Sequence, residues 1–94
     1  MFEMPVNKNI KEVSLILARI RDPRLVEGFL KEILTPSELK SFSSRWDIVK
    51  LLAEGTTQRK IAHDLHLSLC NITRGSKELR KKNSALRKII KSFT

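Results

Sequence analysis

The side chains of this 94-residue chain that could contact a ligand or a polyanion gather in its second half. Residues 57–82 are predicted to form two short helices, and the second carries Ile72 on its inner face, with Leu79 two turns further on. Four side chains that offer hydrogen bonds or positive charge are left for its outer face: Asn71, Thr73, Arg74 and Lys77. Contacts to phosphates and to base edges require groups of this kind.

The shorter helix before the turn would position this surface. The Thr57 hydroxyl can cap its first turn, and Ile61 and Leu65 share one face because they are four residues apart. His66 falls where the chain must turn sharply, and histidine tolerates a left-handed backbone better than most residues. Leu67 would fill the corner between the helices. This spacing is typical of a helix-turn-helix, whose second helix enters the DNA major groove. An ordinary helical hairpin, which uses the same packing pattern, remains the alternative.

The positive charge of the chain is concentrated in the same region. Residues 1–34 hold six Lys or Arg and five acids, residues 35–55 hold three of each, and residues 56–94 hold ten against two. Residues 56–94 therefore carry a net charge of +8 (ten minus two), out of +9 for the whole chain. Nucleic acid is the commonest polyanion that such a field attracts. A membrane surface is the rival, but Phe93 is the single aromatic anchor in this segment.

The sequence lacks the residue sets that catalysis or metal binding would need. His63 and His66 have no second pair of ligands, and Asp64 between them does not complete a metal set. Ser68 and Cys70 lack a base and an orienting acid, so we expect neither an enzyme nor a metal site. Cys70 is interpreted as a small apolar filler.

The same features bear on the compartment. A lone cysteine excludes an intramolecular disulfide and fits a reducing environment. The sequence shows no signal-peptide pattern and no apolar run of about 18 residues. We therefore predict a cytoplasmic protein with no membrane partner.

The first half of the chain predicts helices that offer more apolar surface than one chain can cover. Residues 1–7 are interpreted as a short mobile arm, and a helix from Lys8 has its apolar stripe at Ile10, Val13, Leu17 and Ile20. Asp22-Pro23 would end it and start the next helix, with Asp22 as cap. The broad apolar face of that second helix suggests burial against a second subunit.

Clear boundary signals flank the remaining helices. Thr35, Pro36 and Glu38 form a capping pattern for a helix that runs to about Glu54, and Gly55 suits a left-handed cap. Asn83 or Ser84 would start a last helix with its apolar side chains inward: Ala85, Leu86, Ile89, Ile90 and Phe93. No stretch alternates like a strand. The predicted fold is all-α, with six helices in one domain spanning residues 1–94.

The chain resembles the bacterial tryptophan repressor family. The resemblance rests on Leu34-Thr35-Pro36, Arg45, Ile48-Val49, Leu51-Leu52-Ala53-Glu54-Gly55, Gln58-Arg59 and above all Ile72-Thr73-Arg74-Gly75-Ser76. It implies an intertwined homodimer, with residues 8–54 and 84–93 in the shared core and residues 57–82 as DNA-reading heads. It also implies L-tryptophan as a corepressor between core and head, and no other cofactor.

The resemblance assigns a set of corepressor contacts. Arg45 and Arg74 would sandwich the indole between guanidinium planes, and Arg74 with the Thr35 hydroxyl would hold the carboxylate. The backbone carbonyl of Leu34, from the other subunit, would accept from the ammonium. A glycine inside a helix costs about 1 kcal/mol, and room for the ligand supplies a reason for Gly75.

Two acids depart from the family pattern. Glu32 replaces a residue that is usually apolar, and Glu78 replaces a small hydroxyl residue near the ammonium site. Glu78 could pair with the ammonium and strengthen binding, or with Arg74 and oppose it.

The resemblance also assigns DNA contacts. Arg59 matches the family residue that reaches a guanine, whose paired acceptors suit arginine. The residues at positions that meet bases, often through water, are Leu69, Cys70 and Thr73. The residues placed for phosphates are Asn71, Ser76, Lys77 and Arg80, and Gln58 belongs to the same DNA-binding set.

These observations favour a transcriptional repressor that binds operator DNA more tightly with L-tryptophan and regulates tryptophan supply. Two alternatives stay open: a helix-turn-helix DNA binder that needs no ligand, and a basic dimeric RNA-binding or scaffold protein.

Overall fold

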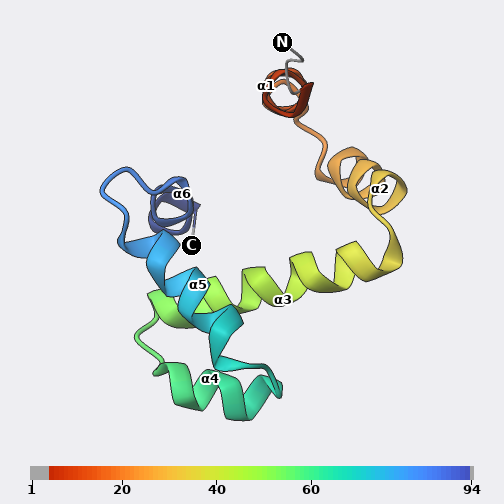
Figure 1. Ribbon diagram of the computed structural model, residues 1–94. Coiled ribbons are helices and arrows are strands. Elements are labelled where there is room, and N and C mark those ends of the chain that lie inside the picture. The colour runs from red at the N-terminus through yellow and green to blue at the C-terminus, as the bar shows by residue number, and fades with distance from the viewer. Residues whose placement is uncertain (1–4, 94) are drawn as a thin grey trace. The chain divides into compact units, whose positions relative to one another are not determined.

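The computed structural model describes residues 5–93, and all of the regular secondary structure in this range is helical (Figure 1). Its six helices are α1 (Pro5–Leu17), α2 (Pro23–Ile33), α3 (Pro36–Ala53), α4 (Gln58–Leu65), α5 (Leu69–Arg80) and α6 (Ala85–Phe93). No strand occurs among the described residues, which confirms the all-α prediction. The chain divides into two compact units, residues 1–39 and residues 40–94. Each unit is described by itself.

Helix α1 differs from its sequence-based prediction at both ends. It begins at Pro5, so the predicted arm is wrong for residues 5–7, and residues 1–4 of that arm lie outside the described residues. It ends at Leu17, well before Asp22, and the Ile20 amide donates to the Leu17 carbonyl at 3.2 Å. Bonds of this three-residue span tighten a final turn and do not continue an α-helix. The predicted apolar stripe included Ile20, which lies beyond α1, because apolar periodicity does not report where the backbone leaves the helix.

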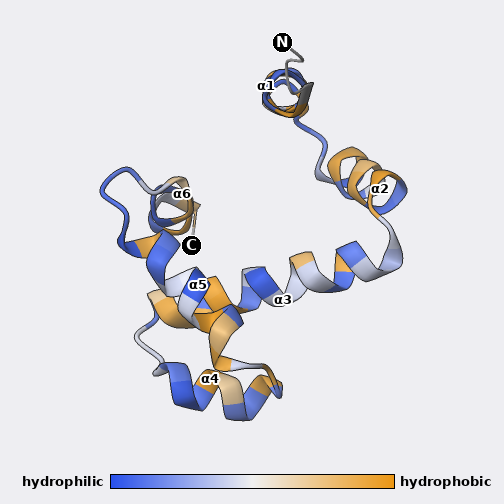
Figure 2. Ribbon diagram, in the orientation of Figure 1, coloured by the Kyte–Doolittle hydropathy of each residue, from blue (hydrophilic) through white to orange (hydrophobic). Residues whose placement is uncertain are grey.

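Helix α2 begins as predicted and buries none of its residues. Asp22 is its cap, with Oδ1 accepting from the Arg24 amide at 3.0 Å, and Pro23 takes the first helical position. Leu25 and Ile33 are each 58% exposed. Figure 2 shows an apolar face on α2, and in α1 Ile10 and Leu15 are 62% and 59% exposed. The chain alone therefore leaves apolar surface of the kind that a second subunit covers.

Both ends of α3 agree with their sequence signals. The Glu38 amide donates to Thr35 Oγ1 at 3.1 Å, and the Thr35 amide donates to Glu38 Oε1 at 2.9 Å, so the capping box is closed. Gly55 adopts a φ of 92° after the last turn, and its amide donates to the Leu52 carbonyl at 3.0 Å. Glycine adopts this left-handed geometry without a Cβ penalty.

The core of the second unit joins α3, α4 and α5. Ile48, Ile61 and Ile72 come one from each helix and are 2%, 0% and 0% exposed. Five partly buried apolar residues pack around them: Leu51, Leu52, Ala62, Leu65 and Leu67. Figure 1 shows α5 crossing α3, with α4 next to α5. The cluster fixes α4 and α5 against the second half of α3.

Helix α6 is capped but only partly buried. Ser84 Oγ accepts from the Arg87 amide at 3.1 Å, and Ile90 is buried. The prediction that the whole apolar face turns inward is wrong for the single chain, because Ile89 is 46% and Phe93 is 81% exposed. The apolar stripe is wider than the surface of the chain that covers it, so sequence pattern alone overestimates its burial.

Candidate nucleic-acid interface and ligand cavity

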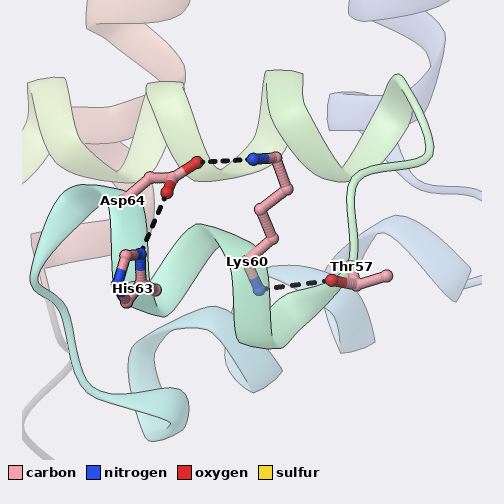
Figure 3. Close-up of polar contacts among 4 residues, drawn as sticks. All are labelled: Thr57, Lys60, His63 and Asp64. Atoms are coloured by element: carbon pink, nitrogen blue, oxygen red, sulfur yellow. Dashed lines mark hydrogen bonds and ion pairs between the residues drawn. The ribbon is translucent and has the colours of Figure 1, made fainter.

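The turn between α4 and α5 has the geometry that the sequence predicts. Thr57 Oγ1 accepts from the Lys60 amide at 3.2 Å and caps α4 (Figure 3). His66 follows α4 in a left-handed conformation, with φ 54° and ψ 43°. The Ala62 carbonyl accepts from the amides of both His66 and Leu67. These bonds end α4 sharply, so that α5 can start at Leu69.

A hydrogen bond that the sequence did not predict joins the two helices. Thr73 Oγ1 donates to Gln58 Oε1 at 3.1 Å, which links α5 to the first residue of α4. Both side chains are half-buried. Gln58 and Thr73 were predicted only as DNA contacts, and the structure shows that they also link α4 to α5. The Gln58 amide group still has its two N–H donors for a phosphate.

The other predicted DNA-contacting residues lie on the same helical pair. Six of the set are exposed: Arg59, Leu69, Cys70, Asn71, Lys77 and Arg80. Ser76 is half-buried, and its carbonyl accepts from Arg80 Nε at 3.4 Å. The interpretation of Cys70 as an apolar filler is wrong, because the thiol is exposed. Position 70 is two residues before the buried Ile72, which places it on a different face of α5.

Lysine side chains neutralise both acids of residues 56–94. Asp64 accepts from His63 and pairs with Lys60 Nζ, both at 3.2 Å (Figure 3), and these contacts lower its pKa, His63 more than Lys60. Glu78 pairs with Lys81 Nζ at 2.7 Å, and this hydrogen bond is the main cause of its lowered pKa. Within the described residues, the other eight cations of this segment have no carboxylate partner. The segment therefore attracts anions at neutral pH.

A cavity of about 120 Å³ lies between α3, α5 and α6. It brings together four of the predicted corepressor residues: Arg45, Arg74, Gly75 and Glu78. Its remaining lining is Ile48, Val49, Asn71 and Leu86. An enclosed cavity of about 150 Å³ holds one benzene ring. A bicyclic ring must therefore separate α3 and α5 slightly or remain partly exposed.

The other two predicted corepressor residues, Leu34 and Thr35, belong to the first unit. The Thr35 hydroxyl already accepts the α3 capping bond from the Glu38 amide. A hydroxyl has one further acceptor site and one donor, so this bond leaves the donor available. Their contact with a ligand stays a prediction.

The pairing of Glu78 bears on the ligand cavity. The sequence left Glu78 free to pair with a ligand ammonium or with Arg74, and the structure pairs it with Lys81. Arg74 acts on Glu78 only as a weak, longer-range charge that helps lower its pKa. The Arg74 guanidinium therefore keeps its donors for another anion.

Gly75 has a packing reason that the sequence did not reveal. A Cβ at this position would lie 3.2 Å from Ile48 Cγ2 and 3.5 Å from Leu52 Cδ1. Gly75 thus permits the close approach of α5 to α3, in addition to lining the cavity. The sequence suggested room for a ligand as the reason for this glycine. In the structure, the atoms closest to an added Cβ belong to side chains of α3. The contact joins residues far apart in the chain, so no local signal reports it.

Among residues 5–93, no group of three or more His, Cys, Asp and Glu side chains is placed to hold a metal ion. In the same part of the chain, no helix combines the length and the apolar character needed to cross a membrane.

Comparisons with known proteins match nearly the whole chain. The model of a family described as Trp repressor protein matches residues 8–94. A Trp operon repressor homolog from Chlamydia caviae is 36% identical over 79 residues, which cover 83% of this chain and 78% of the relative. A homolog of the same name from Vibrio parahaemolyticus is 36% identical over 74 residues, or 78% of this chain and 71% of the relative. One from Chlamydia trachomatis serovar D is 33% identical over 66 residues, or 69% and 70%. No solved structure gives a significant match.

Proposed function

Because this chain belongs to the Trp repressor family, we propose that it is a homodimeric repressor that binds operator DNA more tightly when L-tryptophan is bound. The family regulates transcription and is not a family of enzymes. The genes that this chain controls would supply tryptophan, and its site of action would be the cytoplasm. The observation that carries the proposal is the cavity where Arg45, Arg74 and Gly75 meet.

The cavity offers the chemistry that an aromatic amino acid requires. Two guanidinium groups can stack on an indole ring, and Arg74 can also donate to the carboxylate. Ile48, Val49 and Leu86 give the ring an apolar surface. In a dimer, the Leu34 carbonyl of the partner subunit and the Thr35 hydroxyl would complete the site at the ammonium and the carboxylate.

The position of the cavity suggests how the ligand controls DNA binding. Arg45, Ile48 and Val49 belong to α3, whereas Arg74 and Gly75 belong to α5. A ligand bound between these helices would set the distance of the reading helix from the core. In a dimer, this distance sets the separation of the two reading helices, which must match successive major grooves.

Residues of α4 and α5 would make the DNA contacts. Arg59 would read a guanine, and Leu69, Cys70 and Thr73 would meet bases directly or through water. The phosphate contacts would come from Gln58, Asn71, Ser76, Lys77 and Arg80. The eight cations without a carboxylate partner predict a steep dependence of affinity on salt.

Calorimetry with L-tryptophan tests the ligand site. Wild-type protein should bind the amino acid. Arg74→Ala should abolish the binding, because it removes the side chain that contacts the ligand carboxylate and one of the two guanidinium planes that stack on the indole. Arg24→Ala is the matched control, since its side chain is 93% exposed and it lies in α2. Retained binding in Arg74→Ala would reject the site. No binding by the wild type, together with operator affinity, would favour a ligand-independent DNA binder.

A further inference from the structure

One wall of the ligand cavity comes from α6, which the family resemblance did not connect with the corepressor. Among the described residues that line the cavity, Leu86 is the only one from this helix. The same side chain lines a second cavity, of about 240 Å³. The other residues that line this second cavity are Phe42, Arg45, Trp46 and Val49. Leu86 therefore borders both the ligand cavity and a mainly apolar space next to it.

The next residue, Arg87, holds the first turn of α6 against the end of α5. Its guanidinium donates to the Leu79 carbonyl at 3.3 Å and to the Lys82 carbonyl at 2.7 Å. Leu79 lies in the last turn of α5, where carbonyl groups have no partner inside the helix and where the helix dipole favours positive charge. Arg87 thus joins α6 both to α5 and to the loop between the two helices.

A buried serine fixes the backbone of the same turn. Ser84 is 6% exposed, and its Oγ accepts from the Arg87 amide at 3.1 Å. The Ser84 carbonyl accepts from the Lys88 amide at 3.2 Å. The serine therefore fixes where α6 begins, whereas the Arg87 guanidinium fixes how this turn lies against α5. Together they give Leu86 a defined position at the ligand cavity.

We propose that Leu86 determines which aromatic ring the ligand cavity accepts, and that Arg87 is its positioning residue. The cavity measures about 120 Å³, less than the roughly 150 Å³ that holds one benzene ring. With so little spare volume, an added methyl group on the ligand must displace packed neighbours. One methylene more or less in an apolar pocket changes discrimination about 10–200-fold. The position of the Leu86 wall therefore sets the largest ring that binds.

This inference deepens the proposed function and rests on it, since it concerns the choice of ligand by the same cavity. Arg87 does not line the cavity, so it acts on the ligand only through Leu86. Loss of the Arg87 hydrogen bonds would let the first turn of α6 move away from α5, and a wall that yields no longer excludes a larger ring. Leu86→Ala would remove the wall itself and open the cavity toward the apolar space next to it.

Calorimetry of the full chain with L-tryptophan, and with tryptophans methylated at single positions of the benzene ring, tests the proposal. The measured quantity is the affinity for each methylated ligand divided by the affinity for L-tryptophan. Because both affinities come from one variant, a uniform loss of folded protein cancels. Leu86→Ala should raise the ratio about tenfold or more for the ring position that faces α6. Arg87→Met should raise it less at the same position, and Arg87→Lys, which can still donate to one carbonyl, should restore part of the wild-type ratio.

Ile89→Ala and Lys88→Met are the matched controls, because both residues are exposed on α6 and neither lines the cavity. They should leave every ratio unchanged. In a Leu86→Ala background, Arg87→Met should add nothing, because no wall is left to position.

The outcomes separate the two roles from the proposed function. Wild-type ratios in Leu86→Ala would overturn the role of Leu86. Additive effects of Leu86→Ala and Arg87→Met would overturn the positioning role of Arg87. If the wild type bound none of these ligands, the proposed function itself would be refuted, and this inference with it.

Discussion

Replacement of Gly75 by alanine tests whether close packing of α5 against α3 explains the glycine. Alanine favours a helix over glycine by about 1 kcal/mol. The new Cβ would lie 3.2 Å from Ile48 Cγ2, and Ile48 is 2% exposed, so the methyl group has little room to move. Overpacking of a core costs about 1–3 kcal/mol. We therefore expect Gly75→Ala to lower the free energy of unfolding by about 0–2 kcal/mol.

Urea unfolding followed by circular dichroism, at one fixed protein concentration, measures this change. Gly75→Ala should also be made in two variants of Ile48. Ile48→Ala removes the Cγ2 methyl, and Ile48→Val keeps it. Alanine at Gly75 should be better tolerated with Ile48→Ala than with Ile48→Val, and the double-mutant cycle isolates this coupling. An increase in stability by the full 1 kcal/mol of helix propensity, with no coupling to Ile48, would refute the packing argument.

Three further variants test other parts of the account. Arg59→Ala should cost about 1–3 kcal/mol of operator affinity and relax one position of the binding site, and an unchanged site preference in a selection experiment would remove Arg59 from base reading. Thr73→Val should lower the free energy of unfolding by about 0.5–1.5 kcal/mol through loss of the hydrogen bond to Gln58. Equal urea midpoints for this variant and the wild type would contradict that effect. Asp64 has a lowered pKa in the folded state, so its stabilising effect is present above its unfolded pKa and is lost as the pH falls through the folded pKa. Asp64→Asn should therefore unfold less steeply with acid than the wild type, and identical acid titrations would contradict this role.

Local signals in the sequence predicted the starts of α2, α3 and α4. The cap of α2 at Asp22, the closed capping box of Thr35 and Glu38, and the Thr57 cap each depend on residues two or three positions apart. The left-handed His66 followed from its place at the sharp turn between two predicted helices. Such features are set by neighbouring residues, so sequence reasoning reaches them.

The parts that sequence reasoning missed depend on contacts between distant residues or on what covers a surface. Gln58 and Thr73 meet because α4 and α5 pack, and Gly75 meets Ile48 because α5 crosses α3. The exposure of Phe93 depends on what the rest of the chain can cover, which the pattern of α6 does not state.

The candidate site was predicted unevenly. The family resemblance assigned to the corepressor four of the eight residues that line the ligand cavity, but it did not determine how Glu78 pairs. Glu78 could reach more than one cation, and the choice of Lys81 is a matter of side-chain geometry on α5.

The affinity of the purified protein for operator DNA, measured by mobility shift with and without L-tryptophan, tests the central claim most directly. Allosteric coupling between two ligands typically changes affinity about 5–150-fold, and an increase in this range is expected for the wild type and not for Arg74→Ala. Equal operator affinity with and without the amino acid would contradict the account.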